Sequence, residues 1–293
     1  MGVSLDRAIL AVDGGGSRCR MVLEAGPQRF ATEAGPTNVA SDRDGAVAEI
    51  LGALSRLSRT CGVAVDALAG IPTYLGLAGI VDASDREALR PFLPFSDARI
   101  EDDRPAALAG ALGPTGAGTI AHCGTGSFLG RRADGKTRFA GGWGHRLGDE
   151  ASATWVARRA LAATLAASDE TASATDLTRA LSDRLGRARG IVDFAHNASA
   201  HELGALAPEV TRAADLGDPV ARGILEDGAG YLARMLDALG RREEEPVCLT
   251  GGLGRCYAPY LLGTLTARLQ NPLGEPIDGA LALARSFVRE REI

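Results

Sequence analysis

The sequence has almost no lysine, few aromatic residues and no long apolar run. Lys136 is the single lysine, so a phosphate-binding loop of the GxxxxGK[ST] type, which needs a lysine, is excluded. Aromatic residues make up 4%, so the core must be built mainly from Ala, Leu, Val and Ile. No stretch approaches the ~18 apolar residues of a transmembrane helix. The N-terminus also lacks the apolar run and cleavage site of a signal peptide. We therefore expect a cytoplasmic protein without a membrane partner.

The sequence also lacks cysteine spacings typical of metal sites or disulfides, and it lacks a net positive charge. The five cysteines are odd in number, widely spaced and without a CxxC pair. This pattern predicts free thiols in a reducing compartment and argues against a disulfide framework or a zinc site. The four histidines likewise show no metal-ligand spacing. The formal net charge is −5, which argues against a nucleic-acid partner, because such proteins carry a basic surface.

What is present is typical of a globular protein of one large or two medium domains. The 293 residues are 45% hydrophobic and 24% charged, which is sufficient for a substantial core. The 38 glycines are numerous, and some of them cluster in turns that follow apolar runs. The positions of these glycines therefore carry most of the functional information.

The chain contains an internal repeat, because each half opens with a strand, a glycine-rich turn and two further strands. The predicted strands of the first half are 8–12, 21–23 and 28–34, and those of the second are 118–123, 128–131 and 138–142. Further strands are predicted at 73–78, 99–102 and 246–250, and helices at 42–57, 85–93, 105–112, across 149–239 and at 279–289. This pattern predicts two α/β lobes around a cleft, with the glycine turns at the carboxyl ends of strands.

The two repeated turns have the composition of phosphate-binding loops. Glycines let the backbone approach a phosphate and turn its N–H groups toward the anion, and the interspersed hydroxyl side chains add donors. Asp13, at a strand end, is suited to hold Mg²⁺ through water. An ordinary hairpin turn is the alternative for each loop alone. The first loop comprises Asp13, Gly14, Gly15, Gly16, Ser17 and Arg18, and the second comprises Gly124, Thr125, Gly126 and Ser127.

Four further groups are candidates for binding or catalysis. The turn at Gly251 and Gly252 is suited either to a flat ring lying on the backbone or to capping a helix. The pair Asp102-Asp103 supplies either a general base for an alcohol or an N-cap for the following helix. An aromatic face beside carboxylates suits a sugar ring. That combination, together with a loop amide, is offered by Trp143, Gly144, Asp149, Glu150 and Asn38, although Asp149 is also suited to cap a helix and Asn38 to form a turn.

Taken in order, these segments resemble the BadF/BadG-type ATPase family, and within it the N-acetylglucosamine and glucosamine kinases. Each segment alone is weak, but their order and spacing over nearly the whole chain are specific. The resemblance implies an actin/hexokinase-like fold of two lobes, residues 1–113 and 114–278, with an ATP cleft between them. Helix 279–293 is expected to pack back on the first lobe. The matching segments are AVDGGGSRCR, AGPTN, GLAG, EDDRPAALAGALG, GTGS, GGWGHRLGDEAS and LTGGLG.

The resemblance also implies roles for individual residues. The catalytic aspartate of the family precedes the first alanine of an AAL run by three residues, which selects Asp103. The phosphate motifs fall on Asp13–Arg18 and Gly124–Ser127, and the adenosine motif on Gly251–Gly254. ATP and Mg²⁺ are the implied cofactors, and an amino sugar is the implied partner. The implied sugar-binding residues are Asn38, Trp143, Gly144, Asp149 and Glu150.

The sequence departs from the family pattern at two positions. The family commonly has Thr where this chain has Ser17, which keeps the hydroxyl group. It usually has Gly where this chain has Ala151, a change that bears on the sugar pocket.

We expect ATP-dependent phosphorylation of the 6-hydroxyl of glucosamine or N-acetylglucosamine. An iron–sulfur ATPase that activates a dehydratase and a non-catalytic sugar-binding regulator are the alternatives. Related kinases are often dimers, so the resemblance is compatible with a homodimer.

Overall fold

The computed structural model describes residues 3–291, which form two compact units. Unit 1 consists of the described residues up to Gly116 together with those from Pro272 onward. Unit 2 consists of Ala117–Asn271. The chain thus leaves unit 1, forms unit 2, and returns to unit 1 with its last helix. The boundaries expected from the sequence lie after residues 113 and 278.

Unit 1 contains a five-stranded mixed sheet with strand order β3-β2-β1-β4-β5. The first three strands pair antiparallel, and the last two run parallel to β1. β4 is buried along its whole length, which fits its apolar sequence TYLGL and a sheet covered on both faces. The strands are β1 (Ile9–Gly14), β2 (Cys19–Ala25), β3 (Gln28–Ala34), β4 (Thr73–Leu77) and β5 (Ala98–Glu101).

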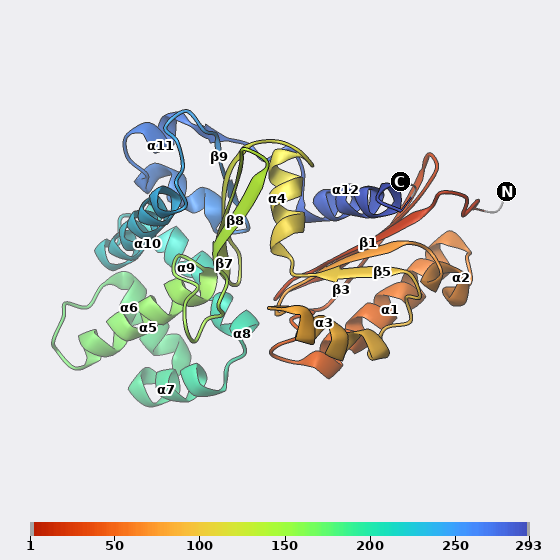
Figure 1. The fold of residues 1–293 in the computed structure, drawn as a ribbon. Helices are drawn as coiled ribbons and strands as arrows, with labels where there is room; N and C mark the ends of the chain where they lie inside the picture. Colours follow the sequence, from red (N-terminus) through yellow and green to blue (C-terminus); the bar gives the residue numbers. More distant parts are fainter. Residues whose placement is uncertain (1–2, 292–293) are drawn as a thin grey trace. The chain divides into compact units, whose positions relative to one another are not determined.

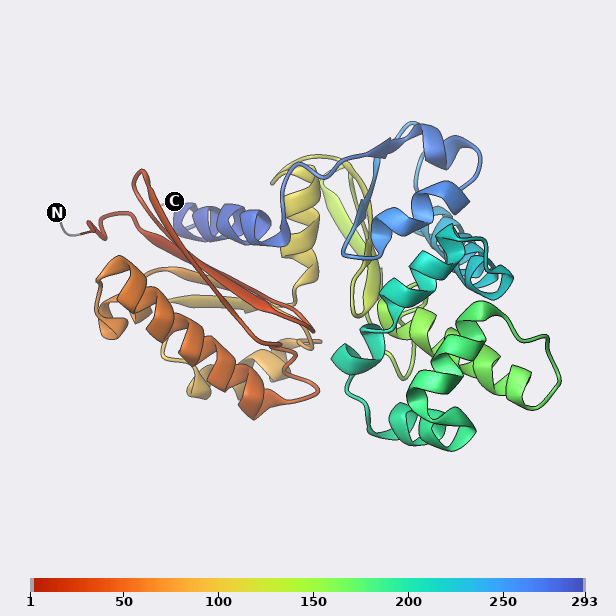
Figure 2. The same ribbon diagram turned by 180° about the vertical axis from the view of Figure 1, so that it is seen from behind.

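Helices cover both faces of the unit 1 sheet (Figures 1 and 2). The side chain of Asp42 caps the first helix by accepting a hydrogen bond of 2.9 Å from the Gly45 N–H. One face is covered by α1 (Arg43–Cys61), α2 (Val65–Ala69), α3 (Ala83–Leu89) and the 3₁₀ turn η1 (Arg90–Phe92). The opposite face is covered by α4 (Arg104–Leu112) and α12 (Pro276–Arg289).

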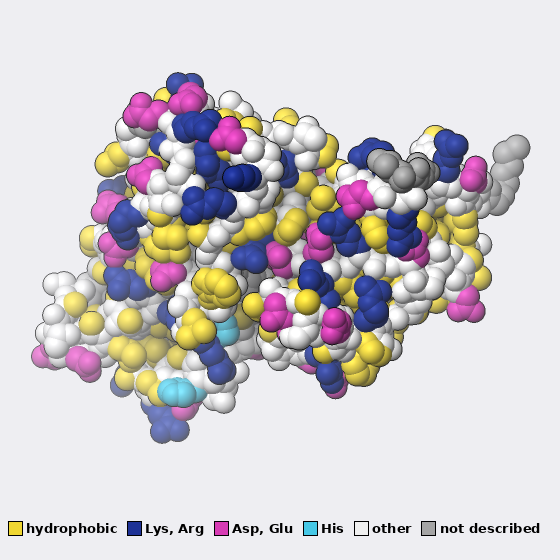
Figure 3. Space-filling model, viewed as in Figure 1, with side chains coloured by type: hydrophobic (Ala, Val, Ile, Leu, Met, Phe, Trp, Pro, Cys, Tyr) yellow, Lys and Arg dark blue, Asp and Glu magenta, His cyan; other side chains and the backbone are white. Residues whose placement is uncertain are grey.

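The helix α12 is an integral part of unit 1. Its apolar face, which includes Ile277, Leu281 and Ala284, packs against Tyr74 and strand β1 in one buried cluster. Its polar side forms ion pairs with the sheet, and Figure 3 shows basic and acidic side chains interleaved around this helix. The pairs are Arg29–Asp278 at 2.9 Å, Glu24–Arg285 at 2.6 Å and Arg99–Glu290 at 3.0 Å.

Unit 2 repeats the sheet topology of unit 1. Its strand order is β10-β9-β6-β7-β8, with β6, β7 and β8 antiparallel and β9 and β10 parallel to β6. Read from the other edge, this order matches that of unit 1 strand for strand. The internal repeat in the sequence therefore corresponds to a repeated fold. The strands are β6 (Gly118–Cys123), β7 (Ser127–Ala133), β8 (Lys136–Gly141), β9 (Val247–Thr250) and β10 (Leu269–Gln270).

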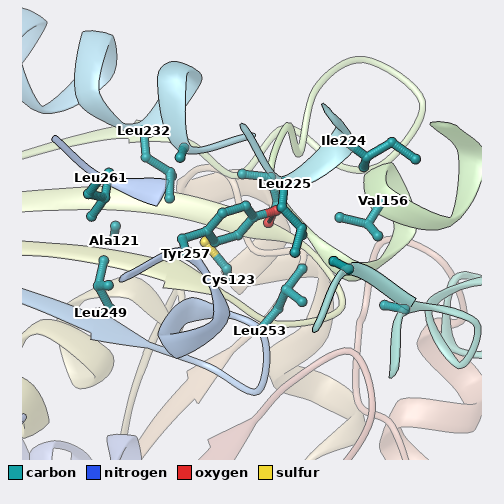
Figure 4. Close-up of a cluster of buried hydrophobic side chains, with 14 of the residues drawn as sticks. Ala121, Cys123, Val156, Ile224, Leu225, Leu232, Leu249, Leu253, Tyr257 and Leu261 are labelled. Carbon is teal, nitrogen blue, oxygen red and sulfur yellow. Dashed lines mark hydrogen bonds between the residues drawn. The ribbon is translucent and has the colours of Figure 1, made fainter. Parts of the chain in front are cut away.

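The core of unit 2 lies between its sheet and a group of Ala- and Leu-rich helices. Figure 4 shows the centre of this core, where Tyr257 lies among Leu225, Leu232, Leu253 and Cys123. No helix in residues 3–291 is both long and apolar enough to span a membrane. The helices are α5 (Ala153–Ser168), α6 (Asp176–Leu185), α7 (Arg187–Asn197), α8 (Ala200–Gly204), α9 (Ala207–Asp215), α10 (Pro219–Ala238) and α11 (Thr264–Ala267), with the 3₁₀ turn η2 (Gly254–Tyr260).

Candidate functional site

The carboxyl ends of the parallel strands β1, β4 and β5 place the candidate residues of unit 1 at one edge of its sheet. Asp13 and Gly14 belong to β1, so the turn itself is shorter than the sequence suggests and runs from Gly15 to Arg18. Its ends are joined by a 2.9 Å hydrogen bond from the Gly15 N–H to the Arg18 carbonyl. Gly16 and Ser17 lie at the tip of this turn, and Arg18 is exposed.

Asp13 is held by Arg20, a residue for which no motif in the sequence indicated a role. The antiparallel register places Asp13 opposite Arg20, whose Nη2 and Nε lie 2.8 and 3.2 Å from Asp13 Oδ2. Arg20 also pairs through Nη1 with Glu275 at 3.1 Å. Burial raises the pKa of Asp13, and the Arg20 cation opposes that shift. Both contacts use the same oxygen of Asp13, so Oδ1 is not engaged by Arg20.

The two aspartates that follow β5 have different surroundings. Asp102 Oδ1 accepts hydrogen bonds from the Arg104 N–H at 2.9 Å and from its guanidinium at 2.8 Å. Asp103 is the first residue before α4 but makes no capping hydrogen bond with its side chain. Burial, with the nearby carboxylates of Asp13 and Asp102, raises the pKa of Asp103 to about 7. Asp102 thus organises the helix start, whereas Asp103 is a carboxyl group poised to exchange a proton near neutral pH.

Asn38 lies in a loop that is tied to the same edge of the sheet. The loop backbone bonds to the ends of two strands, from Thr37 N–H to Gly15 and from Val39 N–H to Ala78, each at 3.0 Å. The Asn38 side-chain oxygen accepts from the backbone N–H groups of Ala40 and Ser41 at 3.1 and 3.2 Å. The amide oxygen therefore shapes the loop, which is the turn role considered for this residue.

In unit 2, the second phosphate loop and the Gly251 turn are in direct contact. Cys123, immediately before the loop, accepts a 2.9 Å hydrogen bond through its carbonyl from the Leu253 N–H. Gly251 has φ +78°, and a Cβ there would lie 2.8 Å from the nitrogen of Gly124. Only glycine fits this position, both for its backbone conformation and for its close approach. The two glycine turns therefore form one continuous backbone surface, with Gly252 exposed on it.

The start of α5 supports the second phosphate loop from the other side. The N–H groups of Ala153 and Thr154 donate to the carbonyls of Gly124 and Thr125 at 2.9 and 3.3 Å. The N-cap of α5 is Ser152, whose hydroxyl accepts from the Trp155 N–H at 3.1 Å. The suggestion that Asp149 caps this helix is therefore wrong, because the N-cap position lies three residues further along the chain, at Ser152. Asp149 remains available for another role.

Asp149 and Glu150 lie against the second phosphate loop. A Cβ on Gly126 would lie 2.7 Å from Asp149 Oδ2, so this carboxylate sits directly over the loop. Burial raises the pKa of Asp149, while hydrogen bonds from the Ser127 and Gly144 N–H groups lower it. The Ser127 hydroxyl donates to the Glu150 carbonyl at 2.6 Å. The sugar-binding and phosphate-binding candidates of unit 2 are therefore in contact.

Two tyrosines complete this region, and no pattern in the sequence indicated either of them. The hydroxyl of Tyr231 on α10 is hydrogen-bonded to the Glu150 side chain, and burial together with the Glu150 charge raises the pKa of Tyr231 to about 12. The hydroxyl of Tyr257 on η2 donates to the Ala151 carbonyl at 2.9 Å. Neither tyrosine has a spacing signal, because Tyr257 lies 106 residues from Ala151 along the chain and Tyr231 lies 81 residues from Glu150. Only the fold brings each tyrosine to its partner.

Trp143 and Gly144 lie on an exposed loop that follows β8. The Trp143 side chain is 62% exposed, as expected for an aromatic residue flanked by glycines. The loop is joined to the phosphate loop by a 2.9 Å hydrogen bond from the Gly142 N–H to the Ser127 carbonyl. It closes on itself where the Gly148 N–H donates to the Gly144 carbonyl at 2.9 Å. Trp143 thus presents an aromatic surface near the carboxylates of unit 2.

The candidate residues therefore form one set in each unit. In unit 1, the first glycine turn, the Asn38 loop, Asp13 and Asp103 gather at one sheet edge. In unit 2, the second phosphate loop, the Gly251 turn and the Asp149–Glu150 segment share hydrogen bonds and close contacts. Backbone N–H groups and hydroxyls are suited to phosphate oxygens, and carboxylates to hydroxyl groups. A carboxyl with a pKa of about 7 is suited to general base catalysis.

Comparison with known families gives a match over most of the chain. The model of the BadF/BadG/BcrA/BcrD ATPase family matches residues 10–275. The glucosamine kinase GspK of Vibrio cholerae serotype O1 is 27% identical over 283 residues, covering 94% of this chain and 95% of that protein. An N-acetylmuramic acid/N-acetylglucosamine kinase of Clostridium acetobutylicum is 26% identical, covering 83% and 84%.

Solved structures show the same fold. A protein from Chromobacterium violaceum, assigned as an N-acetylglucosamine kinase, superposes with a TM-score of 0.85 at 30% identity, covering 95% of this chain and 99% of that chain. A ROK family glucokinase of Streptomyces griseus, solved with glucose and AMPPNP, superposes with a TM-score of 0.57 at 18% identity, covering 95% and 99%. The repeated five-stranded sheet is thus the actin/hexokinase-like fold expected from the sequence.

Proposed function

Because the chain belongs to the BadF/BadG/BcrA/BcrD ATPase family, we propose that it is a kinase that transfers the terminal phosphoryl group of ATP to the 6-hydroxyl group of an amino sugar, either glucosamine or N-acetylglucosamine. The observation that carries this proposal is Asp103, a carboxyl group whose pKa is raised to about 7 beside Asp13. The relatives matched along most of their length are named as amino-sugar kinases, which supports this substrate class. The same names do not favour the iron–sulfur activator or the regulator.

In the proposed reaction, Asp103 accepts the proton of the sugar hydroxyl as that oxygen bonds to phosphorus. A general base of this kind contributes about 10²–10⁴-fold to the rate. Phosphoryl transfer otherwise depends on positioning and on stabilisation of charge at the phosphate oxygens. The first and second phosphate loops supply backbone N–H groups and the hydroxyls of Ser17, Thr125 and Ser127 for this purpose. The Gly251–Gly252 backbone is suited to the adenosine moiety because it is exposed and carries no side chains.

Asp13 fits a role in holding Mg²⁺ through water. Its carboxylate is a hard oxygen ligand, and Arg20 engages Oδ2 while Oδ1 is not engaged by that arginine. When bound, Mg²⁺ would neutralise part of the phosphate charge. Arg20 would keep the Asp13 carboxylate oriented beside the first glycine turn.

The proposed sugar contacts are the residues that the family resemblance selects. Carboxylates of Asp149 and Glu150 are suited to accept hydrogen bonds from sugar hydroxyls, and Asn38 adds an amide group. The exposed face of Trp143 is suited to the apolar C–H face of a pyranose ring, and Gly144 lets the chain turn beside it. These contacts orient the sugar, while the glycine turns bind the nucleotide.

The function is tested with Asp103→Asn and the matched control Asp102→Asn. A coupled ATP assay over glucosamine, N-acetylglucosamine and glucose should detect turnover of an amino sugar by the wild type. Asp103→Asn should lower kcat by about 10²–10⁴-fold while retaining ATP binding, because only the proton acceptor is lost. Asp102→Asn should cost less than about tenfold, since Asp102 acts through Arg104 and the helix start.

The position of phosphorylation needs a separate measurement. Phosphorus NMR of the product should report a 6-phosphate, and a 6-deoxy amino sugar should not be phosphorylated. Turnover of the 6-deoxy sugar would contradict the proposed acceptor hydroxyl. Near-normal turnover by Asp103→Asn, with loss in Asp102→Asn, would move the base to Asp102.

A further inference from the structure

The segment that carries Asp149 and Glu150 has a backbone that L-residues rarely adopt. Asp149 has φ +60° and Ala151 has φ +65°, so two non-glycine residues in three lie in the left-handed region. Ala151 is fully buried in the core of unit 2, so its methyl group packs inward and is not presented on the loop surface. A conformation of this kind persists only where neighbouring contacts hold it.

The hydroxyl of Tyr257 supplies such a contact from behind the segment. Tyr257 is fully buried, and its ring lies among Leu225, Leu253 and Cys123 (Figure 4). Its hydroxyl donates a 2.9 Å hydrogen bond to the carbonyl of Ala151. Burial raises the pKa of Tyr257 far above its usual value, so the hydroxyl remains a donor. The bond therefore fixes the orientation of the peptide between Ala151 and Ser152.

The position of the Tyr257 ring is itself fixed by a glycine on α10. A Cβ on Gly228 would lie 2.6 Å from Tyr257 Cε1 and 2.8 Å from its hydroxyl oxygen. Any larger residue at position 228 would therefore displace the ring and its hydroxyl. By contrast, a Cβ on Gly223 of the same helix would meet no atom within 4 Å. The sequence thus leaves a space on α10 that the tyrosine occupies.

We propose that Tyr257 is a positioning residue for substrate binding, which acts by holding Asp149 and Glu150 in place through its hydrogen bond to Ala151. The inference rests on the proposed function, in which these two carboxylates bind the sugar. Tyr257 touches neither substrate, because it is buried behind the segment. Loss of the hydroxyl alone leaves the ring in place, and with it the packing of η2 after the Gly251 turn. Its effect should therefore fall mainly on the KM for the sugar, and less on that for ATP.

The first test replaces only the hydroxyl group. Tyr257→Phe should raise the KM for the amino sugar about fivefold, as expected for loss of one hydrogen bond worth ~1 kcal/mol. The KM for ATP should stay within about twofold. Tyr260→Phe is the matched control on the same η2 turn and should leave both values unchanged. An unchanged sugar KM in Tyr257→Phe, or an equal rise in both KM values, overturns the proposal.

Rescue by glycine separates a positioning role from a general loss of stability. Glycine adopts the left-handed region without strain, so adding Ala151→Gly to Tyr257→Phe should bring the sugar KM back to within about twofold of wild type. A merely structural role would leave the double variant as impaired as the single one, and that result would refute the inference.

A second route avoids changing the tyrosine at all. Gly228→Ala should displace the Tyr257 ring and raise the sugar KM, while Gly223→Ala on the same helix should not. Equal effects of the two changes would contradict the role of Tyr257. This pair also remains informative if Tyr257→Phe does not fold, because alanine favours helix at both positions.

Hydrogen exchange distinguishes failure of this inference from failure of the proposed function. Backbone amides of residues 147–153 should exchange at least about fivefold faster in Tyr257→Phe than in the wild type, whatever the enzyme phosphorylates. If the wild type phosphorylates no amino sugar, the proposed function fails while the exchange result still tests the hydrogen bond. Unchanged exchange in this segment overturns the positioning role directly.

Discussion

Asp102 and Asp103 are neighbours in sequence whose surroundings give them different chemistry. The Asp102 carboxylate forms an ion pair with the Arg104 guanidinium at the start of α4. Asp103 makes no capping hydrogen bond, and burial beside two carboxylates raises its pKa to about 7. A pKa of about 7 suits Asp103 to exchange a proton near neutral pH.

This raised pKa predicts an acid limb in the pH profile of the reaction. The base must be ionised, and protonation below a pKa of about 7 removes the proton acceptor. The kcat/KM for the amino sugar at saturating ATP should be flat above about pH 8. It should fall close to tenfold per pH unit well below pH 7. Initial rates across pH 5–9 would check this, and a profile flat down to pH 5 would exclude Asp103 as the base.

Single residues show what the sequence can and cannot reveal. Composition and spacing selected the glycine turns and the aspartate pair, but the choice of Asp103 came from the family resemblance. Arg20, Tyr231 and Tyr257 were missed, since each acts through a partner set by strand register or helix packing. The left-handed φ of Ala151 gives a physical reason for the glycine usual at that position in the family.

At the scale of elements, the helices α4 and α12 cross closely because glycine occurs on each. A Cβ on Gly110 would lie 2.7 Å from the Glu275 carbonyl carbon, and one on Gly279 would lie 2.9 Å from the Ala106 carbonyl carbon. Such contacts leave no room for a side chain without moving one helix. The crossing therefore fixes how α12 lies on unit 1.

Gly279→Val should destabilise the protein through this crossing. We expect a loss of about 1–3 kcal/mol in the free energy of unfolding, because overpacking forces backbone shifts. Urea denaturation followed by circular dichroism would measure it. Gly223→Val is the control, since its side chain would enter open space on another helix. Equal losses in the two variants would mean that helix propensity, and not the crossing, sets the cost.

Element boundaries followed from the sequence where a local signal exists. Strand β3 lies at the predicted residues 28–34, and α1 begins at Arg43, one residue after the start of the helix predicted over 42–57. The helix expected from 149 begins instead at Ala153, because the chain first passes through two left-handed residues. The elements α2, α11 and β10 were not predicted, as each has five residues or fewer and too short a pattern.

At the scale of the whole molecule, the two sheets repeat one topology, and the repeat was visible in sequence because each half opens in the same way. The position at which the chain returns to unit 1 was harder to predict from the sequence. Helix α12 shares its buried cluster with β1 and β4 of the first hundred residues. No local pattern reports this packing, and the expectation that helix 279–293 packs on the first lobe came with the family resemblance. Unit 1 is therefore assembled from both ends of the described chain.

Removal of this helix should affect the two units unequally. A chain ending at Asn271 lacks the apolar residues of α12 that cover one face of the unit 1 sheet. We expect unit 2 to keep a cooperative thermal transition, while unit 1 loses its own and becomes sensitive to protease. Calorimetry with limited proteolysis and mass spectrometry would check this. Protection of both units in the shortened chain would show that α12 is dispensable for unit 1.

The return of the chain to unit 1 has a consequence for synthesis on the ribosome. Unit 2 is continuous in sequence, so its strands and helices emerge together and can pack as soon as residue 271 has left the exit tunnel. The sheet of unit 1 emerges first but lacks one of its covering helices until residues 276–289 appear. The apolar face that α12 covers must therefore wait, after the first segment of unit 1 is made, for translation of more than half the chain.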